Sequence, residues 1–201
     1  MENRPPETLL FDLGGVIVDF RGGEGMRAAT KGAFDLDFCT NNWGRLPELE
    51  QLERGAIAPA LFADAFIRQW SLEQGRDAFL DEFKHWVRGV VDGAPGILNG
   101  LRSRFRLACL SNLNTLHWDR CVELGVDAFF ETRFLSFEMG ARKPAPQVYA
   151  HVARTLGCAA GDVLFFDDVS ANIDAAHAAG MRAHLVENGD IRTALSREGL
   201  L

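Results

Sequence analysis

The 201-residue sequence has little cysteine and no long apolar run, and these shortages exclude several protein classes. Its four cysteines are widely spaced and include no C-x-x-C pair, so neither a zinc framework nor a disulfide scaffold is predicted. A reduced, cytoplasmic setting is the expectation. The apolar runs are far shorter than the roughly 20 residues that span a bilayer, and the segment Met1–Pro6 lacks the apolar stretch of a secretory signal. No membrane partner is therefore expected.

Clusters of basic residues are also missing, which argues against nucleic acid as a partner. The chain carries 28 acidic and 21 basic residues, a formal net charge of −7, and no run of lysine or arginine. An acidic protein with an anionic ligand needs a local attraction, such as a metal ion, a lysine or main-chain N–H groups. Hydrophobic residues make up 47% of the chain, which is typical of a globular protein, and the length suits one core with a smaller inserted module. The choice between a monomer and a homodimer stays open.

Three strand-like segments end in polar residues. They are Thr8–Phe11 before Asp12, Arg106–Leu110 before Ser111 and Asn112, and Val163–Phe166 before Asp167 and Asp168. Weaker strand patterns cover Arg133–Leu135 and Arg182–Val186. Helical patterns separate the strands, and this alternation predicts an α/β fold with a doubly wound parallel sheet. Because such sheets bind ligands beyond the carboxyl ends of their strands, the polar residues are expected along one edge.

The helices of this core have recognisable ends. The expected boundaries are Asn112 or Asn114 and then Gly125 for a helix over 113–124, Pro144-x-Pro146 and Gly157 for the next helix, and Gly180 at the end of a third. Asparagine is a common N-cap, proline is favoured in the first helical turn, and glycine often follows the last turn.

The stretch 20–92 differs from the rest, because it shows helical faces and no convincing strand. The apolar faces are Leu46/Leu49/Leu52, Leu61/Phe62/Ala65/Phe66 and Phe79/Phe83/Trp86/Val87/Val90. Aromatic residues at helical spacing are usually core residues, so we predict a helical bundle inserted after the first strand, with a return hinge at 92–96. The predicted organisation is an α/β core over 1–19 and 93–201 and a helical cap over 20–92.

Four motifs carry a resemblance to a known family. They are Phe11-Asp12-Leu13-Gly14-Gly15-Val16-Ile17-Val18-Asp19, Leu110-Ser111-Asn112, Arg142-Lys143-Pro144-x-Pro146-x-Val148-Tyr149 and Phe165-Phe166-Asp167-Asp168-x-Ser170-x-Asn172. In this order they resemble the four motifs of the haloacid dehalogenase superfamily, and the helical insert lies where that superfamily has its cap. The residues of these motifs are most similar to those of the branch that contains bacterial α-D-glucose-1-phosphate phosphatases and the N-terminal phosphatase-like domains of epoxide hydrolases.

The resemblance implies a Mg²⁺-dependent phosphatase that acts on a small phosphorylated metabolite, with a sugar phosphate such as glucose-1-phosphate favoured. Asp12 would be the nucleophile and would form an aspartyl-phosphate that water then hydrolyses. Because a carboxylate is repelled by a phosphate, a cation must lie between them. The implied Mg²⁺ ligands are Asp12, the carbonyl of Gly14, Asp168 and Asp167, of which Asp168 is the stronger candidate.

The remaining motif residues would bind the phosphoryl group. Lys143 would place a positive charge on the nucleophile and on the phosphoryl oxygens, as a second catalytic residue. The Ser111 hydroxyl, the Asn112 amide and loop N–H groups near Leu13 and Gly15 would hold the equatorial oxygens. The sequence also offers plainer roles for these residues, since Ser111-Asn112 can cap a helix and one aspartate of the 167–168 pair can do the same.

One position departs from the superfamily's phosphatase pattern. A second aspartate usually stands two residues after the nucleophile and protonates the leaving group, and here that position is Gly14. Positioned proton transfer typically contributes about 10²–10⁴-fold to the rate. Three hypotheses follow: a phosphatase whose leaving group needs little protonation, such as the anomeric oxygen of a sugar-1-phosphate; a dehalogenase or phosphonatase; or a pseudoenzyme that binds a phosphorylated ligand. The Asp167-Asp168 pair argues against the metal-independent dehalogenase.

A few other polar residues attract attention without belonging to the core of the motifs. His117 and His85 are expected to be structural, Tyr149 is expected in the core, and Asn172 is expected to support the Asp167-Asp168 loop. Arg21, next to the glycines at 22–25, is either a substrate contact or a surface arginine.

Overall fold

A five-stranded parallel sheet forms the centre of the fold in the computed structural model, which describes residues 5–43 and 46–201. The strands are β1 (Thr8–Phe11), β4 (Arg106–Ser111), β5 (Thr132–Leu135), β6 (Val163–Asp167) and β7 (Arg182–Leu185), and their order is β5-β4-β1-β6-β7. All four pairings are parallel, which confirms the predicted α/β class. Phe11 pairs with Cys109 on one side and with Phe166 on the other. The residues that follow these three strands therefore emerge at the same edge.

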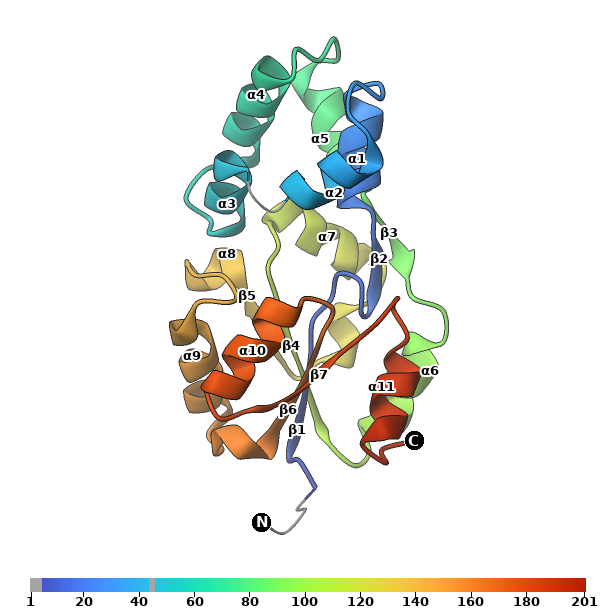
Figure 1. The fold of residues 1–201 in the computed structure, drawn as a ribbon, viewed down its shortest axis with the longest axis vertical. Helices are drawn as coiled ribbons and strands as arrows, with labels where there is room; N and C mark the ends of the chain where they lie inside the picture. The colour runs from blue at the N-terminus through green and yellow to red at the C-terminus, as the bar shows by residue number, and fades with distance from the viewer. Residues whose placement is uncertain (1–4, 44–45) are drawn as a thin grey trace.

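Helices cover both faces of the sheet (Figure 1). One face carries α9 (Pro146–Leu156) and α10 (Ser170–Ala178), and the other carries α6 (Ala94–Leu101), α7 (Thr115–Glu123) and α11 (Ile191–Arg197). Along β1, Leu10 packs in the core under α9 and α10, and Leu9 and Phe11 pack in the core under α6, α7 and α11. This alternation follows from the two-residue period of a strand. Short elements complete the core: α8 (Ser136–Met139) and 3-10 turns over Asp127–Phe129 and Ala160–Asp162.

The predicted helix ends agree with the structure in most places. Asn114, one of the two expected N-caps, accepts a hydrogen bond from the main-chain N–H of His117 at 3.1 Å. Gly157 ends α9 in the left-handed conformation, at a φ of 69°. The expected return hinge at 92–96 is instead the start of α6, because Gly93 is its N-cap and Pro95 lies in its first turn. Within the described parts of the chain, no helix is long and apolar enough to cross a membrane.

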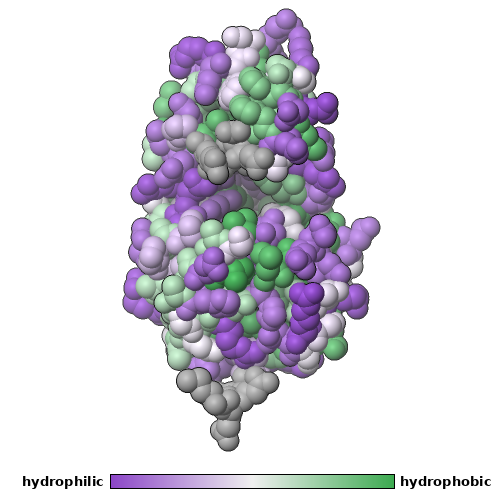
Figure 2. All heavy atoms as spheres, in the orientation of Figure 1, coloured by the Kyte–Doolittle hydropathy of each residue, from purple (hydrophilic) through white to green (hydrophobic). Residues whose placement is uncertain are grey.

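The inserted region forms a separate helical layer with its own core. Its helices are α1 (Gly22–Ala29), α2 (Leu36–Trp43), α3 (Pro47–Glu53), α4 (Pro59–Gln69) and α5 (Arg76–Lys84). Buried aromatic residues dominate the core between them, including Phe62, Phe66, Phe79, Phe83 and Trp86. The helical bundle is therefore confirmed as architecture, although Leu61, expected on its apolar face, is exposed. On the face shown in Figure 2, hydrophilic residues lie over both regions, and the surface is hollowed where they meet.

A two-stranded antiparallel ribbon links the two regions and corrects the prediction that 20–92 holds no strand. It pairs β2 (Val18–Phe20) with β3 (Val87–Val90). Val87 and Val90 continue the helical spacing of Phe79, Phe83 and Trp86, and so the sequence pattern extended the helix too far. In the structure α5 ends at Lys84, and the departing and returning chains satisfy each other's main-chain groups. We keep 20–92 as the proposed extent of the insert.

Candidate active site

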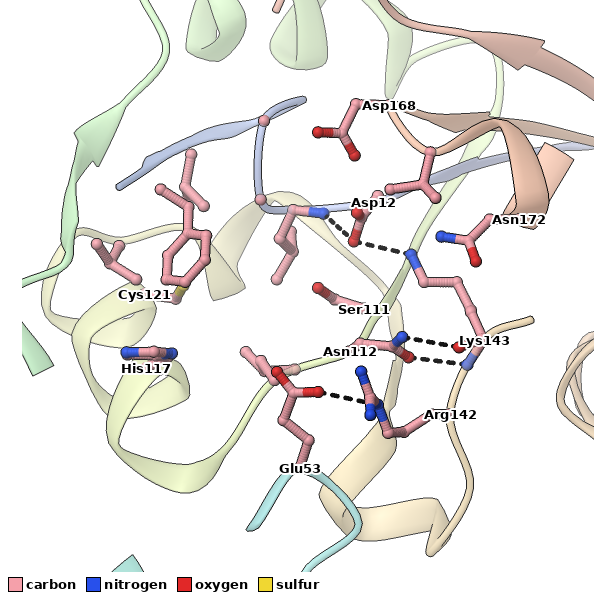
Figure 3. A pocket seen from close by; sticks show the side chains of 18 residues that line it. Asp12, Glu53, Ser111, Asn112, His117, Cys121, Arg142, Lys143, Asp168 and Asn172 are labelled. Atoms are coloured by element: carbon pink, nitrogen blue, oxygen red, sulfur yellow. Dashed lines mark hydrogen bonds and ion pairs between the residues drawn. The ribbon is translucent and has the colours of Figure 1, made fainter. Parts of the chain in front are cut away.

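Loops after β1, β4 and β6 and the segment before α9 meet in one cavity of about 250 Å³, which the insert helps to enclose (Figure 3). Seven of the eight predicted site residues line this cavity. They are Asp12, Gly14, Gly15, Ser111, Asn112, Lys143 and Asp168. The eighth, Asp167, lies behind the cavity wall and is fully buried. The sequence-based expectation that these residues gather at one edge of the sheet agrees with their placement.

Asp12 lies at the end of β1 with its carboxylate held from two sides. Its Oδ1 accepts a hydrogen bond from the main-chain N–H of Leu13 at 2.7 Å and lies 3.0 Å from Nζ of Lys143. Burial raises the pKa of the Asp12 carboxyl, while the Lys143 ammonium and the Ser111 hydroxyl act in the opposite direction. These contacts fix the orientation of the Asp12 carboxylate at the cavity wall, where its oxygen can reach a bound ligand.

Lys143 is a buried cation between two carboxylates. Its Nζ lies 3.0 Å from Asp12 and donates a hydrogen bond to Oδ2 of Asp167 at 2.5 Å. Burial by itself lowers the pKa of the ammonium, but the two carboxylates outweigh burial and hold its pKa above the ordinary lysine value. Lys143 is therefore charged at any physiological pH.

Asp167 is saturated with hydrogen-bond donors. Besides Lys143, its oxygens accept from the main-chain N–H of Val169 at 2.8 Å and from Nδ2 of Asn172 at 2.9 and 3.0 Å. Asn172 is in turn held by Tyr149, whose buried hydroxyl donates to the Asn172 carbonyl at 3.0 Å. Asp167 thus positions Lys143 and adds negative charge to the site, and its oxygens are less open to a metal ion than those of Asp12 and Asp168. The supporting role expected of Asn172 and the core position of Tyr149 agree with these contacts.

Three carboxylates are gathered around a single ammonium group. Oxygen atoms of Asp12, Asp167 and Asp168 lie within 4.8 Å of one another. Partial desolvation, together with the charges of Asp12 and Asp167, raises the pKa of Asp168 to about 7. The cluster keeps an excess of negative charge beside an accessible oxygen of Asp168. Hard oxygen ligands in this arrangement suit a divalent cation such as Mg²⁺.

Gly15 makes this crowding possible. Its φ is +73°, and a Cβ atom at this position would lie 2.3 Å from Oδ2 of Asp168. Its N–H was predicted to bind substrate, but it donates to the Val18 carbonyl at 2.9 Å. The Leu13 N–H is likewise used by Asp12. Gly15 therefore permits the close approach of Asp168, and in this conformation its N–H is not a phosphate donor.

Asn112 also differs from its predicted role. Its Nδ2 donates to the Lys143 carbonyl at 2.9 Å, and its Oδ1 accepts from the Lys143 N–H at 2.8 Å. Both polar atoms of the side-chain amide thus help to fix the main chain of Lys143, and one N–H of Nδ2 is left for a ligand. Ser111 lies buried at the end of β4 and lines the cavity, and its role as a phosphate-binding hydroxyl stays a prediction.

The remaining polar candidates have structural partners. His117 lines the cavity, but its Nε2 donates to the Phe83 carbonyl at 2.9 Å and its Nδ1 accepts from Asn114 at 3.0 Å. Burial lowers the pKa of His117 to about 4, so the ring is neutral. Arg21 forms ion pairs with Asp19 and Glu24 and is not among the residues that line the cavity. The structural interpretation of the histidine is therefore the better one.

Sequence reasoning missed two residues of this cavity, Glu53 and Arg142. Glu53 comes from α3 of the insert and Arg142 from the core segment before Lys143, and their side chains form an ion pair with Oε2 and Nε 2.9 Å apart. Burial raises the pKa of the Glu53 carboxyl to about 7, while Arg142 opposes the shift. No motif marks Glu53, because its approach to the site depends on how the insert docks. Arg142 was visible only as the neighbour of Lys143.

The parallel α/β fold and the site of carboxylates and a lysine indicate a class of hydrolases, and a family model agrees with this class. The model of the haloacid dehalogenase-like hydrolases matches residues 6–180, so the chain belongs to this family. The resemblance to the superfamily drawn from the four motifs is thereby confirmed, and the narrower assignment to the glucose-1-phosphate phosphatase branch stays a prediction.

Named relatives and solved structures extend the comparison. A D-ribitol-5-phosphate phosphatase from Bacteroides thetaiotaomicron is 27% identical over 195 residues, covering 91% of this chain and 93% of the relative. A phosphatase from Mycobacterium tuberculosis is 26% identical, covering 96% and 91%. A solved haloacid dehalogenase family enzyme from Bacteroides thetaiotaomicron, in complex with magnesium and inorganic phosphate, has 23% identity, a TM-score of 0.78 and coverage of 92% and 96%. The structural likeness shows that the fold is shared.

Proposed function

We propose that this chain is a Mg²⁺-dependent phosphatase that hydrolyses a small phosphorylated metabolite through an aspartyl-phosphate on Asp12. The single observation that carries the proposal is the placement of Asp12 between the Lys143 ammonium and the carboxylate of Asp168 in one cavity. The nucleophile, a fixed positive charge and oxygen ligands for a cation are what phosphoryl transfer requires. Two phosphatases among the relatives, and the magnesium and phosphate bound by a protein of the same fold, support it.

Each residue has a defined part in this reaction. Asp12 attacks phosphorus while Lys143 neutralises charge on its oxygen and on the phosphoryl group. Asp12, Asp168 and the Gly14 carbonyl would hold Mg²⁺, and Asp167 would contribute charge and keep Lys143 in place. The bound ion would supply further charge neutralisation at the phosphoryl oxygens. The Ser111 hydroxyl would bind an equatorial oxygen, and Asn112 acts through its grip on Lys143.

The substrate is proposed to be a small sugar or polyol phosphate. A cavity of about 250 Å³ is slightly smaller than the roughly 300–1,000 Å³ of typical small-molecule sites and favours a short ligand. Because Gly14 offers no acid for the leaving group, a sugar-1-phosphate such as glucose-1-phosphate is one candidate. The 27% identical relative, which acts on D-ribitol-5-phosphate, makes a polyol phosphate the other.

Gly14 also favours a second candidate function, a protein that binds a phosphorylated ligand with little or no turnover. Both proposals are tested with p-nitrophenyl phosphate, glucose-1-phosphate and D-ribitol-5-phosphate, each assayed with Mg²⁺ and with EDTA. Turnover that collapses with EDTA and is abolished in a folded Asp12→Asn variant is the expected result. Phosphate binding without turnover would support the second candidate, and halide release indifferent to EDTA would indicate a dehalogenase. Wild-type rates in Asp12→Asn would exclude the proposed nucleophile.

A further inference from the structure

From the Glu53–Arg142 pair we infer that this chain binds the hydroxyl groups of its substrate's organic part, so that it selects hydroxylated phosphate esters over plain alkyl phosphates. The inference rests on the proposed phosphatase function and assigns specificity within the same cavity. Glu53 belongs to the insert and Arg142 to the core, and both side chains line the cavity that holds Asp12 (Figure 3).

The pair is buried, yet its closest atoms lack hydrogen-bond partners. The Glu53 side chain is 8% exposed and the Arg142 side chain 18% exposed. Oε2 and Nε lie 2.9 Å apart, but the angles do not make a hydrogen bond, and both atoms are without a partner among the described residues. A buried polar atom that is left unpaired is unfavourable, and such atoms in a binding cavity are natural contacts for a ligand.

The position of Glu53 is fixed by the docking of α3 on the core. The next residue, Arg54, donates from Nε to the Gly140 carbonyl at 3.1 Å. At Gly55 the main chains approach so closely that a Cβ atom would lie 2.5 Å from the Phe137 carbonyl oxygen. Two contacts immediately after Glu53 thus tie this end of α3 to the core. A carboxylate held in this way can discriminate between ligands, because it cannot easily follow a poorly fitting one.

Different residues of the cavity are available to the phosphate and to the organic part of the substrate. Lys143 points to Asp12, whereas its neighbour Arg142 points to Glu53 (Figure 3). Lys143 also forms an ion pair with Asp167. The cavity lining also includes the apolar side chains of Val18, Phe20, Val87 and Leu113. A substrate with its phosphate at Lys143 would therefore place its carbon chain among apolar groups, with Glu53 and Arg142 as polar contacts.

The chemistry of the pair favours hydroxyl groups over a second anion. Above pH 7, where its carboxyl is ionised, Glu53 neutralises Arg142, so a carboxylate or second phosphate gains no net attraction there. A hydroxyl can donate to the carboxylate and accept from the guanidinium in the same place. A plain alkyl chain would cover both charged groups without pairing them, and sites built for hydroxyl groups reject such analogues strongly.

The test compares D-ribitol-5-phosphate with n-pentyl phosphate, which has the same chain length and no hydroxyl groups. Dissociation constants are measured by calorimetry with Mg²⁺ in the Asp12→Asn protein, so that binding is read without turnover. We expect ribitol-5-phosphate to bind at least about tenfold more tightly than pentyl phosphate, since hydrogen bonds to charged groups are worth at least that factor. Adding Glu53→Gln should reduce this ratio to about threefold or less.

Glu50→Gln is the matched control, because it makes the same chemical change on the same helix. Glu50 lies outside the cavity and pairs with exposed Arg54. This variant should leave the ratio unchanged. Arg142→Lys, which keeps the charge and loses the planar donors, should lower the ratio as Glu53→Gln does, and it serves if Glu53→Gln does not fold. The inference would be overturned if the Asp12→Asn protein bound both ligands equally well or bound neither. It would also be overturned if adding Glu53→Gln left the affinity ratio unchanged or weakened both ligands equally. Failure of the proposed phosphatase would appear separately, as absence of Mg²⁺-dependent turnover in the wild-type protein.

Discussion

The side chain of Asn112 forms two hydrogen bonds with the main chain of Lys143, a residue 31 positions later in the chain. Both polar atoms of the amide are used, and the contact joins the end of β4 to the segment before α9. Because the Lys143 ammonium must reach both Asp12 and Asp167, its main chain has to be held at a defined distance from the sheet edge. Asn112 supplies that constraint.

Loss of these two hydrogen bonds should lower the catalytic rate more than it lowers the stability of the fold. In Asn112→Ala we expect kcat for p-nitrophenyl phosphate to fall about 10- to 100-fold, because a catalytic group displaced by about 1 Å costs that much. Steady-state kinetics and urea unfolding together check the expectation. Asn99→Ala, an exposed asparagine on α6, is the control. An unchanged kcat in a folded Asn112→Ala protein would mean that Lys143 is positioned by its carboxylate partners alone.

Magnesium should stabilise the protein through Asp168. At a Mg²⁺ concentration of about 100 times the dissociation constant, binding to the folded state adds about 2.7 kcal/mol. For a chain of this size, that corresponds to a rise in Tm of about 5–10 °C. Asp168→Asn should lose this rise, and without metal it should be at least as stable as the wild type, because it removes one of three crowded carboxylates. Asp174→Asn, on the exposed side of α10, should respond to Mg²⁺ like the wild type, as thermal shift measurements would show.

Gly14 and Gly15 are neighbours with opposite tolerance for a side chain. A Cβ atom on Gly15 would meet Asp168 at 2.3 Å in a left-handed backbone conformation, whereas one on Gly14 would lie 3.6 Å from the Phe20 side chain, an ordinary contact. Gly15→Ala should therefore lose the Mg²⁺ response and about 1–2 kcal/mol of stability from the backbone conformation alone. Gly14→Ala should fold and bind Mg²⁺ as before. Calorimetric Mg²⁺ titration of both variants decides, and equal behaviour of the two would contradict the geometry.

His117 should make the protein sensitive to acid. Its pKa falls from an ordinary 6.5 to about 4 on folding, so below pH 6.5 the unfolded chain takes up a proton that the folded chain refuses. The stability that depends on neutral His117 is complete above pH 6.5 and is lost as the pH falls through 4. By pH 4.5 this loss amounts to about 2–3 kcal/mol. In His117→Gln, which retains a donor for the Phe83 carbonyl, urea unfolding at pH 7 and 4.5 should show a correspondingly smaller loss. The exposed His85→Gln control should lose as much stability as the wild type.

Glu53 should make the protein less stable as the pH rises, whereas His117 should make it less stable as the pH falls. Its folded pKa of about 7 lies above the unfolded value of 4.5, so its contribution to stability is complete below pH 4.5 and is lost as the pH rises through 7. The loss between pH 4.5 and pH 8.5 is about 3 kcal/mol. Glu53→Gln should therefore resist alkaline destabilisation better than either the wild type or Glu50→Gln. Identical pH profiles for all three would show that Glu53 is ionised in the fold at ordinary cost.

Most of the fold and much of the site could be predicted from local signals. The strands ending at Asp12, Ser111 and the Asp167-Asp168 pair have apolar runs whose length and flanking residues identify them, and parallel pairing then brings their ends together. The ribbon of β2 and β3 was missed for a local reason. Val87 and Val90 continue a helical period, and only the neighbouring chain at Val18–Phe20 supplies the partner that makes them a strand.

The sequence by itself determined the α/β class, the helical insert and the polar residues at the strand ends, because periodicity and helix caps act over a few residues. Lys143, Gly14 and Gly15 joined the predicted site through the family resemblance. Tertiary structure alone decided which atoms of those residues remain available. The Asn112 amide bonds the main chain of Lys143, and the Asp167 oxygens accept four hydrogen bonds from three donor groups. The Gly15 N–H donates to the Val18 carbonyl. Tertiary structure also brought Glu53 to Arg142 across the junction of insert and core. Hydrogen bonds between distant segments depend on positions in space, and no spacing along the chain encodes them.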